Sequence, residues 1–253
     1  MWSIKGKERE KIMFAYKVDI GLVRENNEDA SYIIKKDNND VLMMVFDGMG
    51  GHMYGDVASQ LALDFIKNEF EKKKKFYHKM DMYFWLRRVL LKTNKYLFEY
   101  SKKNKLRGMG TTFACFLIHG KHTLMAYLGD SRCYLVKNNQ LKLVSNDETY
   151  VNFLYESGKI TEEEKLNHPQ KNVITNALGC YLSVIINLEF IKEEYEGLLL
   201  CSDGLYNMVN EEDISATIKL GNNCEECVNV LINKANQKGG KDNIAVALYL
   251  KEN

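Results

Sequence analysis

The feature that most constrains this chain is a short apolar segment that stops abruptly at an aspartate beside a glycine. The pattern occurs in VLMMVFDG (Asp47), TLMAYLGD (Asp130) and GLLLCSDG (Asp203), and GGKDNIAVALY places Asp242 just before its apolar segment. Apolar runs of this length, bounded by turn residues, predict buried strands. Each carboxylate is therefore expected at a strand end, on rigid backbone, where the neighbouring glycine allows main chain to approach closely.

These four aspartates together favour a site for a hard metal ion. Carboxylates from distant segments cannot converge without a cation, because their mutual repulsion and desolvation cost too much. Oxygen-only ligands suit Mg²⁺ or Mn²⁺ better than zinc. A single Asp-Gly pair would be ordinary turn chemistry, but four carboxylates that each adjoin an apolar strand favour the metal interpretation.

A second group of charged residues lies upstream, in GLVRENNEDA, and contains Arg24, Glu28 and Asp29. Taken alone, a basic residue beside two acids is typical of a surface ion-pair cluster. If the aspartates form a two-metal site, Arg24 is expected to bind a phosphate through its planar set of donors. Glu28 and Asp29 would then hold metal-bound waters or complete the ligand set.

The order of periodicities predicts an α+β domain. Strands are expected at 14–20, 41–46, 112–119, 123–128, 132–136, 141–144, 183–191, 197–201 and 244–250, with a hairpin turn at Asn138-Asn139. Helices are expected at 55–70, 82–97, 149–157, 161–167 and, as a pair, 211–236. Consecutive strands with paired helices favour a layered α+β domain over a βαβ parallel fold.

Length and charge limit the other possibilities. The 253 residues suit one domain, here residues 12–253, after a short charged extension at 1–11. A net charge of +1 gives the whole chain no attraction to nucleic acid or membrane. The apolar runs are too short to span a bilayer, and the charged N-terminus has no signal-peptide core. We therefore expect a cytoplasmic protein whose six scattered cysteines are reduced thiols.

The chain resembles the metal-dependent protein phosphatases of the PP2C (PPM) family, especially compact bacterial members. The matching segments extend from Gly21 to about Val246 and are GLVRENNEDA, VFDGMGGHMYGDVAS, RGMGTT, AYLGDSRCYLV, NVITNALG, LLLCSDGL and GGKDNIAV. This resemblance implies a four-layer α/β/β/α sandwich with two central antiparallel β-sheets and a metal site at one edge.

The resemblance also implies a ligand set for two metal ions. Asp47 would bridge the two ions, and the carbonyl group of Gly48 would be a further ligand. Asp203 and Asp242 would complete the core of the site, with Glu28 on its water-bound side.

Three further roles follow from the same resemblance. Asp29 would orient the nucleophilic water, and Arg24 would bind the substrate phosphate. Asp130 would hold a third, weaker ion together with Asp203, although a purely structural role in the GDSR turn is an equally open alternative. The cofactors implied are thus two to three Mn²⁺ or Mg²⁺ ions.

The implied function is a protein serine/threonine phosphatase that hydrolyses phosphoserine and phosphothreonine with a metal-activated water. Such a protein would act on phosphoproteins as a monomer and oppose a bacterial Ser/Thr kinase. The alternative is a catalytically silent adaptor of the same fold, which binds phosphoproteins. Retention of Asp47, Asp203, Asp242 and Arg24 disfavours the adaptor. Cysteine-based phosphatases are excluded, because no cysteine begins a Cys-x5-Arg motif.

The chain departs from the family pattern in three places. Met49 stands where many eukaryotic relatives have a histidine proposed as the general acid, and His52 belongs to the bacterial DGMGGH form and does not inherit that role. Glu148 replaces a common histidine, and Asn176 stands where arginine is frequent. The last two changes are expected to affect substrate preference rather than the metal site.

Overall fold

The computed structural model describes residues 12–50 and 54–251, whose strands form two antiparallel sheets. The first sheet has the order β1-β11-β10-β7-β8. Its strands are β1 (Ile12–Asp19), β7 (Arg132–Lys137), β8 (Gln140–Leu143), β10 (Gly197–Cys201) and β11 (Ile244–Lys251). Because β1 pairs with β11 along its whole length, the first and last described segments lie side by side. The extension expected at 1–11 lies outside the described residues.

The second sheet has the order β2-β3-β5-β6-β9, and the short β4 pairs with the end of β3. Its strands are β2 (Asp29–Lys35), β3 (Val41–Met49), β4 (Gly110–Thr111), β5 (Phe113–His119), β6 (His122–Leu128) and β9 (Asn187–Phe190). Strand β3 lies between β2 and β5, so its backbone is paired on both sides.

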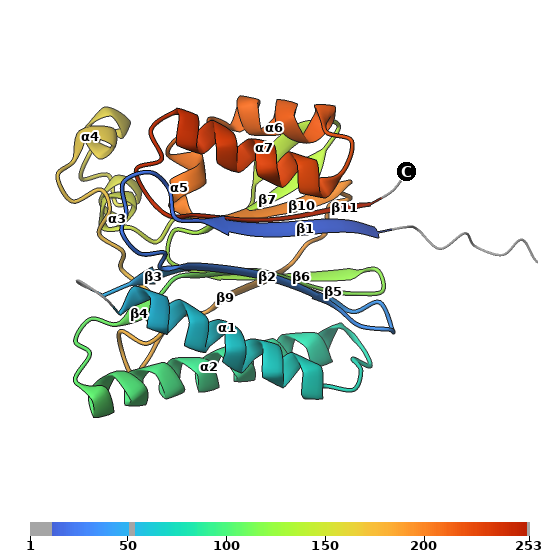
Figure 1. The fold of residues 1–253 in the computed structure, drawn as a ribbon. Coiled ribbons are helices and arrows are strands. Elements are labelled where there is room, and N and C mark those ends of the chain that lie inside the picture. Colours follow the sequence, from blue (N-terminus) through green and yellow to red (C-terminus); the bar gives the residue numbers. More distant parts are fainter. Residues whose placement is uncertain (1–11, 51–53, 252–253) are drawn as a thin grey trace, which may run out of the picture.

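Helices cover the outer face of each sheet (Figure 1). Helices α1 (Gly55–Lys72) and α2 (Lys79–Asn104) pack on the second sheet, while α6 (Glu211–Leu220) and α7 (Cys224–Gln237) pack on the first. The short helices α3 (Tyr150–Glu156), α4 (Glu162–Asn167) and α5 (Asp203–Tyr206) gather at one end. The arrangement confirms the expected four-layer α/β/β/α sandwich.

Period-two alternation along the central strands divides the core into three layers. In β3, Leu42, Met44 and Phe46 pack toward α1 and α2. The intervening Val41, Met43 and Val45 pack between the two sheets, together with alternate residues of β10 and β11. Because strand side chains alternate between faces, Asp47 continues the inter-sheet series at the end of the strand.

Most of the expected elements are confirmed; the short β4 and α5 and the longer β2 were not predicted, and β9 differs in length. The residues at the Asn138-Asn139 turn have φ values of 50° and 57°, as a tight type I′ hairpin requires. Strand β2 was not predicted, because its first residue follows a polar segment that is typical of a loop. Strand β9 is shorter than the expected 183–191, and the carbonyl of Ile185 accepts instead from the Asn176 side chain at 2.7 Å.

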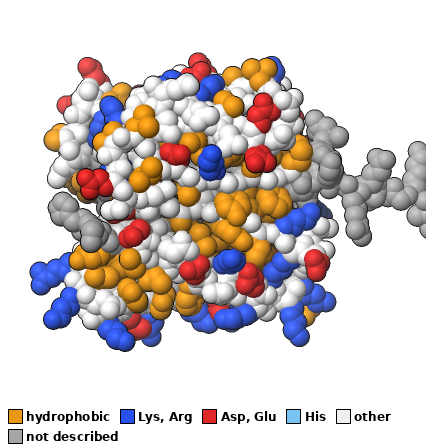
Figure 2. Space-filling view, in the orientation of Figure 1, with side chains coloured by type: hydrophobic (Ala, Val, Ile, Leu, Met, Phe, Trp, Pro, Cys, Tyr) orange, Lys and Arg blue, Asp and Glu red, His pale blue; other side chains and the backbone are white. Residues whose placement is uncertain are grey.

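The described part of the chain contains no disulfide and no helix suited to span a membrane. None of its helices is both long and apolar enough to cross a membrane. On the face shown in Figure 2, Lys and Arg side chains gather over the layer of α1 and α2. All six cysteines are free, and Cys224 and Cys227 are buried on α7.

Candidate active site

The site lies where the space between the two sheets opens at one end. Asp47 and Asp29 face each other across the β2–β3 ladder, on the strand faces that point between the sheets. Asn243 and Asp242 arrive from the first sheet, directly before β11. Both sheets therefore contribute polar residues to one region, on backbone that the strand pairing holds rigid.

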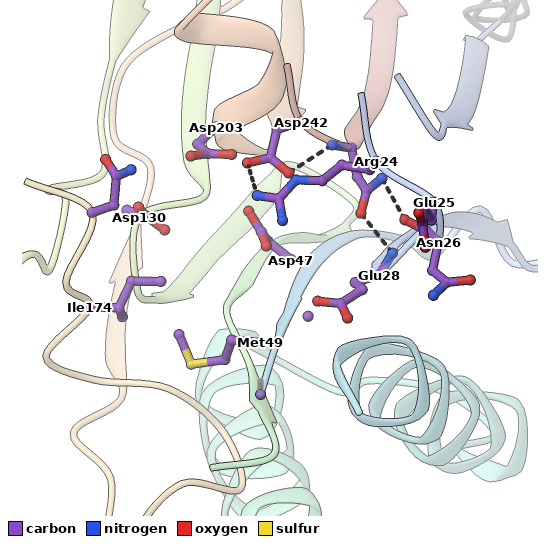
Figure 3. Close-up of a pocket in the computed structure, with 14 residues that line it drawn as sticks. Arg24, Glu25, Asn26, Glu28, Asp47, Met49, Asp130, Ile174, Asp203 and Asp242 are labelled. Atoms are coloured by element: carbon purple, nitrogen blue, oxygen red, sulfur yellow. Dashed lines mark hydrogen bonds and ion pairs between the residues drawn. The ribbon is translucent and has the colours of Figure 1, made fainter. Parts of the chain in front are cut away.

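A pocket of about 520 Å³ brings together most of the residues expected from the sequence. The predicted residues that line it are Arg24, Glu28, Asp47, Gly48, Asp130, Asp203 and Asp242. Figure 3 shows the carboxylates of this set converging from different strands and loops around the pocket. Two central strands, β3 and β10, deliver Asp47 and Asp203 at or just beyond their ends.

Asp29 does not line this pocket and is buried, with 8% of its surface exposed. The hydroxyl of Ser202 donates to its Oδ2 at 2.5 Å, and the same hydroxyl accepts from the backbone N–H of Ala245 at 2.8 Å. Burial raises the pKa of Asp29 well above its ordinary range, against the stabilising bond from Ser202. Asp29 is thus a buried carboxyl fixed by both sheets.

Arg24 is paired with one of the carboxylates that the sequence assigns to metal binding. Its Nη2 donates to Asp242 Oδ2 at 2.7 Å (Figure 3), and the guanidinium side chain remains 53% exposed. The other Asp242 oxygen, Oδ1, accepts from the N–H of Asn243 at 2.9 Å. The hydrogen bond to Asp242 raises the pKa of Arg24. Sequence reasoning did not anticipate this pair.

Asn243 is a site residue that sequence reasoning missed, although it stands inside the KDN of GGKDNIAV. Its Oδ1 accepts from the N–H of Glu28 at 2.8 Å, and its Nδ2 donates to the carbonyls of Ile20 and Asn26 at 2.8 and 2.9 Å. The side chain therefore ties the upstream segment to the first sheet. Burial, followed by the charge of Asp56, raises the pKa of Glu28.

The glycines beside the aspartates allow the close backbone approach that the sequence predicts. A Cβ on Gly48 would lie 2.1 Å from the carbonyl oxygen of Gly55 and 2.5 Å from that of Glu28. A Cβ on Gly204 would lie 1.9 Å from the carbonyl oxygen of Asn243. Neither position can accept a larger residue unless backbone moves.

Three of the carboxylates, those of Asp47, Asp203 and Asp130, have raised pKa values. Burial raises the pKa of Asp47 well above its ordinary range, and the charges of Asp29 and Asp203 raise it further. Burial and neighbouring carboxylates also raise the pKa of Asp203 to about 6 and that of Asp130 to about 7. Asp130 Oδ1 is buried and has no hydrogen-bond partner among the described residues. A buried carboxylate oxygen without a donor is costly unless a cation satisfies it.

The residues fit a hard divalent cation by donor type. The pocket offers carboxylates and backbone carbonyls, and such oxygen donors suit Mg²⁺ or Mn²⁺. Within the described ranges, no three His, Cys, Asp or Glu side chains already stand close enough to hold an ion.

The other residues expected from the sequence fall around this pocket. Met49, which replaces a histidine of eukaryotic relatives, lines it. Glu148 and Asn176 do not, but Asn172 and Ile174, from the same segment as Asn176, form part of one wall. His52 lies outside the described residues.

Comparison with known proteins agrees with this geometry. A family model described as protein phosphatase 2C matches residues 23–244. The serine/threonine phosphatase of Listeria welshimeri is 35% identical over 235 residues, which are 92% of this chain and 93% of that protein. The solved Streptococcus agalactiae serine/threonine phosphatase superposes with a TM-score of 0.90 at 32% identity, over 96% of this chain and 100% of the other.

A second solved structure, the Staphylococcus aureus serine/threonine phosphatase, gives a TM-score of 0.88 at 33% identity over 99% of this chain and 100% of the other. The match to the family model covers far more than half of the chain, and it includes every predicted site residue. The two sheets, the carboxylate pocket and these relatives agree: the chain belongs to the protein phosphatase 2C family and is a protein serine/threonine phosphatase.

Proposed function

We propose that this protein hydrolyses phosphoserine and phosphothreonine monoesters of proteins in the carboxylate pocket, with the help of two to three Mn²⁺ or Mg²⁺ ions. The observation that carries this proposal is the convergence of seven predicted residues on one pocket. The unpartnered Asp130 Oδ1 among them adds support. Dependence on metal ions is general in the family, whereas the number and identity of the ions here are part of the proposal.

The proposed ligands are residues whose oxygens already line the pocket. Asp47, Asp203 and Asp242 form the core, with the Gly48 carbonyl and Glu28 beside them. Burial raises the pKa of Asp47, Asp203 and Glu28, and neighbouring carboxylates raise each of these pKa values further. When bound, the ions would polarise the phosphoryl group and activate a water for attack on phosphorus. The protein contributes rigid strand ends that hold the ligands before any ion arrives.

Asp130 is proposed as the ligand of a third, weaker ion, shared with Asp203. Its side chain is 6% exposed, and burial raises its pKa to about 7. A role only in holding the GDSR turn does not account for the Oδ1 that lacks a partner.

Arg24 is proposed to bind the substrate phosphate at the mouth of the pocket. Only its Nη2 is engaged by Asp242, so the remaining N–H groups of its planar fork can donate to phosphoryl oxygens. The pair with Asp242 orients the guanidinium toward the carboxylates, where a phosphate would be held between Arg24 and the cations. This placement also stabilises the charge that develops on the phosphoryl oxygens.

Asp29 is proposed to orient the attacking water. Ser202 fixes its Oδ2, and the β2–β3 register places it opposite Asp47.

The biological setting follows from the substrate class. Phosphoprotein substrates imply an opposing protein kinase, and we propose a Ser/Thr kinase in that role. We also propose that residues 12–253 act as one phosphatase domain and that the protein is a monomer.

The test of function is phosphate release from matched phosphothreonine, phosphoserine and phosphotyrosine peptides in Mn²⁺ and in EDTA. We expect release from the first two peptides only with the metal, and little release from the phosphotyrosine peptide. A folded, Mn²⁺-binding protein that binds phosphothreonine peptide without releasing phosphate would instead support the adaptor alternative.

A further inference from the structure

Glu148 lies outside the pocket, yet its backbone joins two segments that form the pocket wall. Its N–H donates to the carbonyl of Gly129 at 2.9 Å. Its own carbonyl accepts from the N–H and the hydroxyl of Thr175, both at 2.8 Å. The residue thus sits between the turn that precedes Asp130 and the segment that carries Ile174.

The Glu148 carboxylate collects three donors from three different parts of the fold. Oε2 accepts from the N–H of Gly129 at 2.9 Å and from Asn176 Nδ2 at 2.8 Å. Oε1 accepts from Asn187 Nδ2, at the start of β9, at 2.8 Å. Hydrogen bonds to an ionised carboxylate are stronger than those between neutral groups. We call Glu148, Asn176 and Asn187 the Glu148 cluster.

The bonds to Gly129 fix the direction in which the chain enters Asp130. Glu148 holds the N–H of Gly129 with its side chain and the C=O of Gly129 with its backbone. These two groups belong to the two planar peptide units that flank Gly129, so both of its soft dihedral angles are restrained. Gly129 has a φ of +87°, and a Cβ there would lie 2.8 Å from Thr112 Cγ2. The conformation therefore needs glycine, and the two bonds from Glu148 restrain this otherwise permissive residue.

The same cluster places one wall of the pocket. Asn176 bridges Glu148 and the carbonyl of Ile185, and Ile174, two residues earlier, lines the pocket on the same side as Asp130 (Figure 3). The position of Asp130 and the position of this wall therefore depend on one set of hydrogen bonds. Glu148 and Asn176, which the sequence analysis singled out separately, thus contact each other directly.

We propose that Glu148 is a positioning residue that aims Asp130 into the pocket and couples the affinity of the cation at Asp130 to the placement of residues 172–176. This proposal rests on the proposed ligand role of Asp130, and it can be tested without substrate. Residues that orient metal ligands from outside the ligand shell alter metal affinity by about 10- to 100-fold when they are removed.

The test compares Glu148→Gln and Asn176→Ala with a matched control, Glu156→Ala. Glu156 accepts from Asn146 and Asn152 at 2.7 and 3.1 Å rather than from the turn at Gly129. Mn²⁺ binding to EDTA-treated, dialysed protein is measured by isothermal titration calorimetry, with Asp130→Asn identifying the step that belongs to Asp130. Glu148→Gln preserves the size of the side chain, so the variant is expected to fold.

We expect Glu148→Gln and Asn176→Ala to weaken the Asp130-dependent step by about tenfold or more and to leave the tighter steps within about twofold. Glu156→Ala should leave every step within about twofold. An unchanged Asp130-dependent step in folded Glu148→Gln protein would overturn the proposal. Identical titrations of the wild type and Asp130→Asn would also overturn it.

A second measurement uses no metal. In hydrogen–deuterium exchange of the metal-free protein, Glu148→Gln should speed exchange both at 129–131 and at 172–176, whereas Glu156→Ala should do neither. Faster exchange at 172–176 alone would show a local role and contradict the coupling. Because neither measurement involves phosphate release, a failure here is distinct from a failure of the proposed phosphatase reaction.

Discussion

Replacing Asp130 by Asn should stabilise the metal-free protein at neutral pH. Asp130 is 6% exposed, its Oδ1 lacks a partner, and burial raises its pKa from 3.8 to about 7. A tenfold change in a proton-binding constant corresponds to about 1.4 kcal/mol, so ionised Asp130 costs the folded state about 4 kcal/mol above pH 7. Asparagine keeps the shape of the side chain and removes the charge.

The size of this effect depends on pH. Below the unfolded pKa both states are protonated, and the group makes no difference to the free energy of unfolding. Between pH 3.8 and about 7 the unfolded state ionises while the folded state keeps its proton, so wild-type stability falls as pH rises. The advantage of Asp130→Asn should therefore grow by about 2–3 kcal/mol between pH 5 and pH 8.

Urea denaturation of both proteins in EDTA, at pH 5 and at pH 8, measures this difference. Asp213→Asn serves as the control, because the hydrogen bond from the Lys238 side chain lowers the pKa of Asp213, opposite to the shift at Asp130. Asp213→Asn should therefore slightly lower the free energy of unfolding at pH 8. Saturating Mn²⁺ should stabilise the wild type more than Asp130→Asn. A difference between wild type and Asp130→Asn that does not change with pH, or a less stable variant at pH 8, would refute the reasoning.

Three further predictions follow. Gly48→Ala should lower the free energy of unfolding by about 2 kcal/mol or more, because the added Cβ would lie 2.1 Å from the Gly55 carbonyl oxygen. Thermal melts measure this loss, with Ala58→Gly in a helix as the control, and an unchanged melting temperature of Gly48→Ala would contradict the prediction. Mn²⁺ affinity should rise between pH 5.5 and 7.5, because protons compete with the ion for the carboxyls of Asp203, with a pKa of about 6, and Asp130, with a pKa of about 7. Calorimetry at constant ionic strength measures this affinity, and an affinity that does not change with pH would count against these ligands. In steady-state kinetics, Arg24→Lys should raise the KM for a phosphothreonine peptide by about tenfold, with a smaller change in kcat. An unchanged KM would argue against phosphate binding at Arg24.

The architecture was largely predictable because its elements have strong periodicity. Alternate residues of β3 face different layers, and a run of this kind, buried on both faces, reads clearly in the sequence as a strand. Strand β2 was missed because it begins with a polar residue, Asp29, directly after a polar segment that is typical of a loop. The buried carboxylate of Asp29 accepts a hydrogen bond from Ser202, which is 173 positions away in the sequence. A local sequence pattern cannot contain such a contact.

Seven residues that line the pocket were predicted, but Asn243 and the contacts within the site were not. The aspartates at strand ends were visible because an apolar run that stops at a carboxylate is a local pattern. The pair between Arg24 and Asp242 joins residues 218 positions apart, so only the fold shows it. Asn243 and the contact between Glu148 and Asn176 were invisible for the same reason, since side-chain amides are common in loops and carry no periodic signal.

The most direct test of the central claim is anomalous diffraction from crystals of the active protein grown with Mn²⁺. The account predicts Mn²⁺ peaks in the pocket, bound to Asp47 and Asp203, with Asp242 turned from Arg24 toward an ion. Crystals of active protein that show Mn²⁺ only outside this pocket, with the Arg24–Asp242 pair intact, would contradict the account.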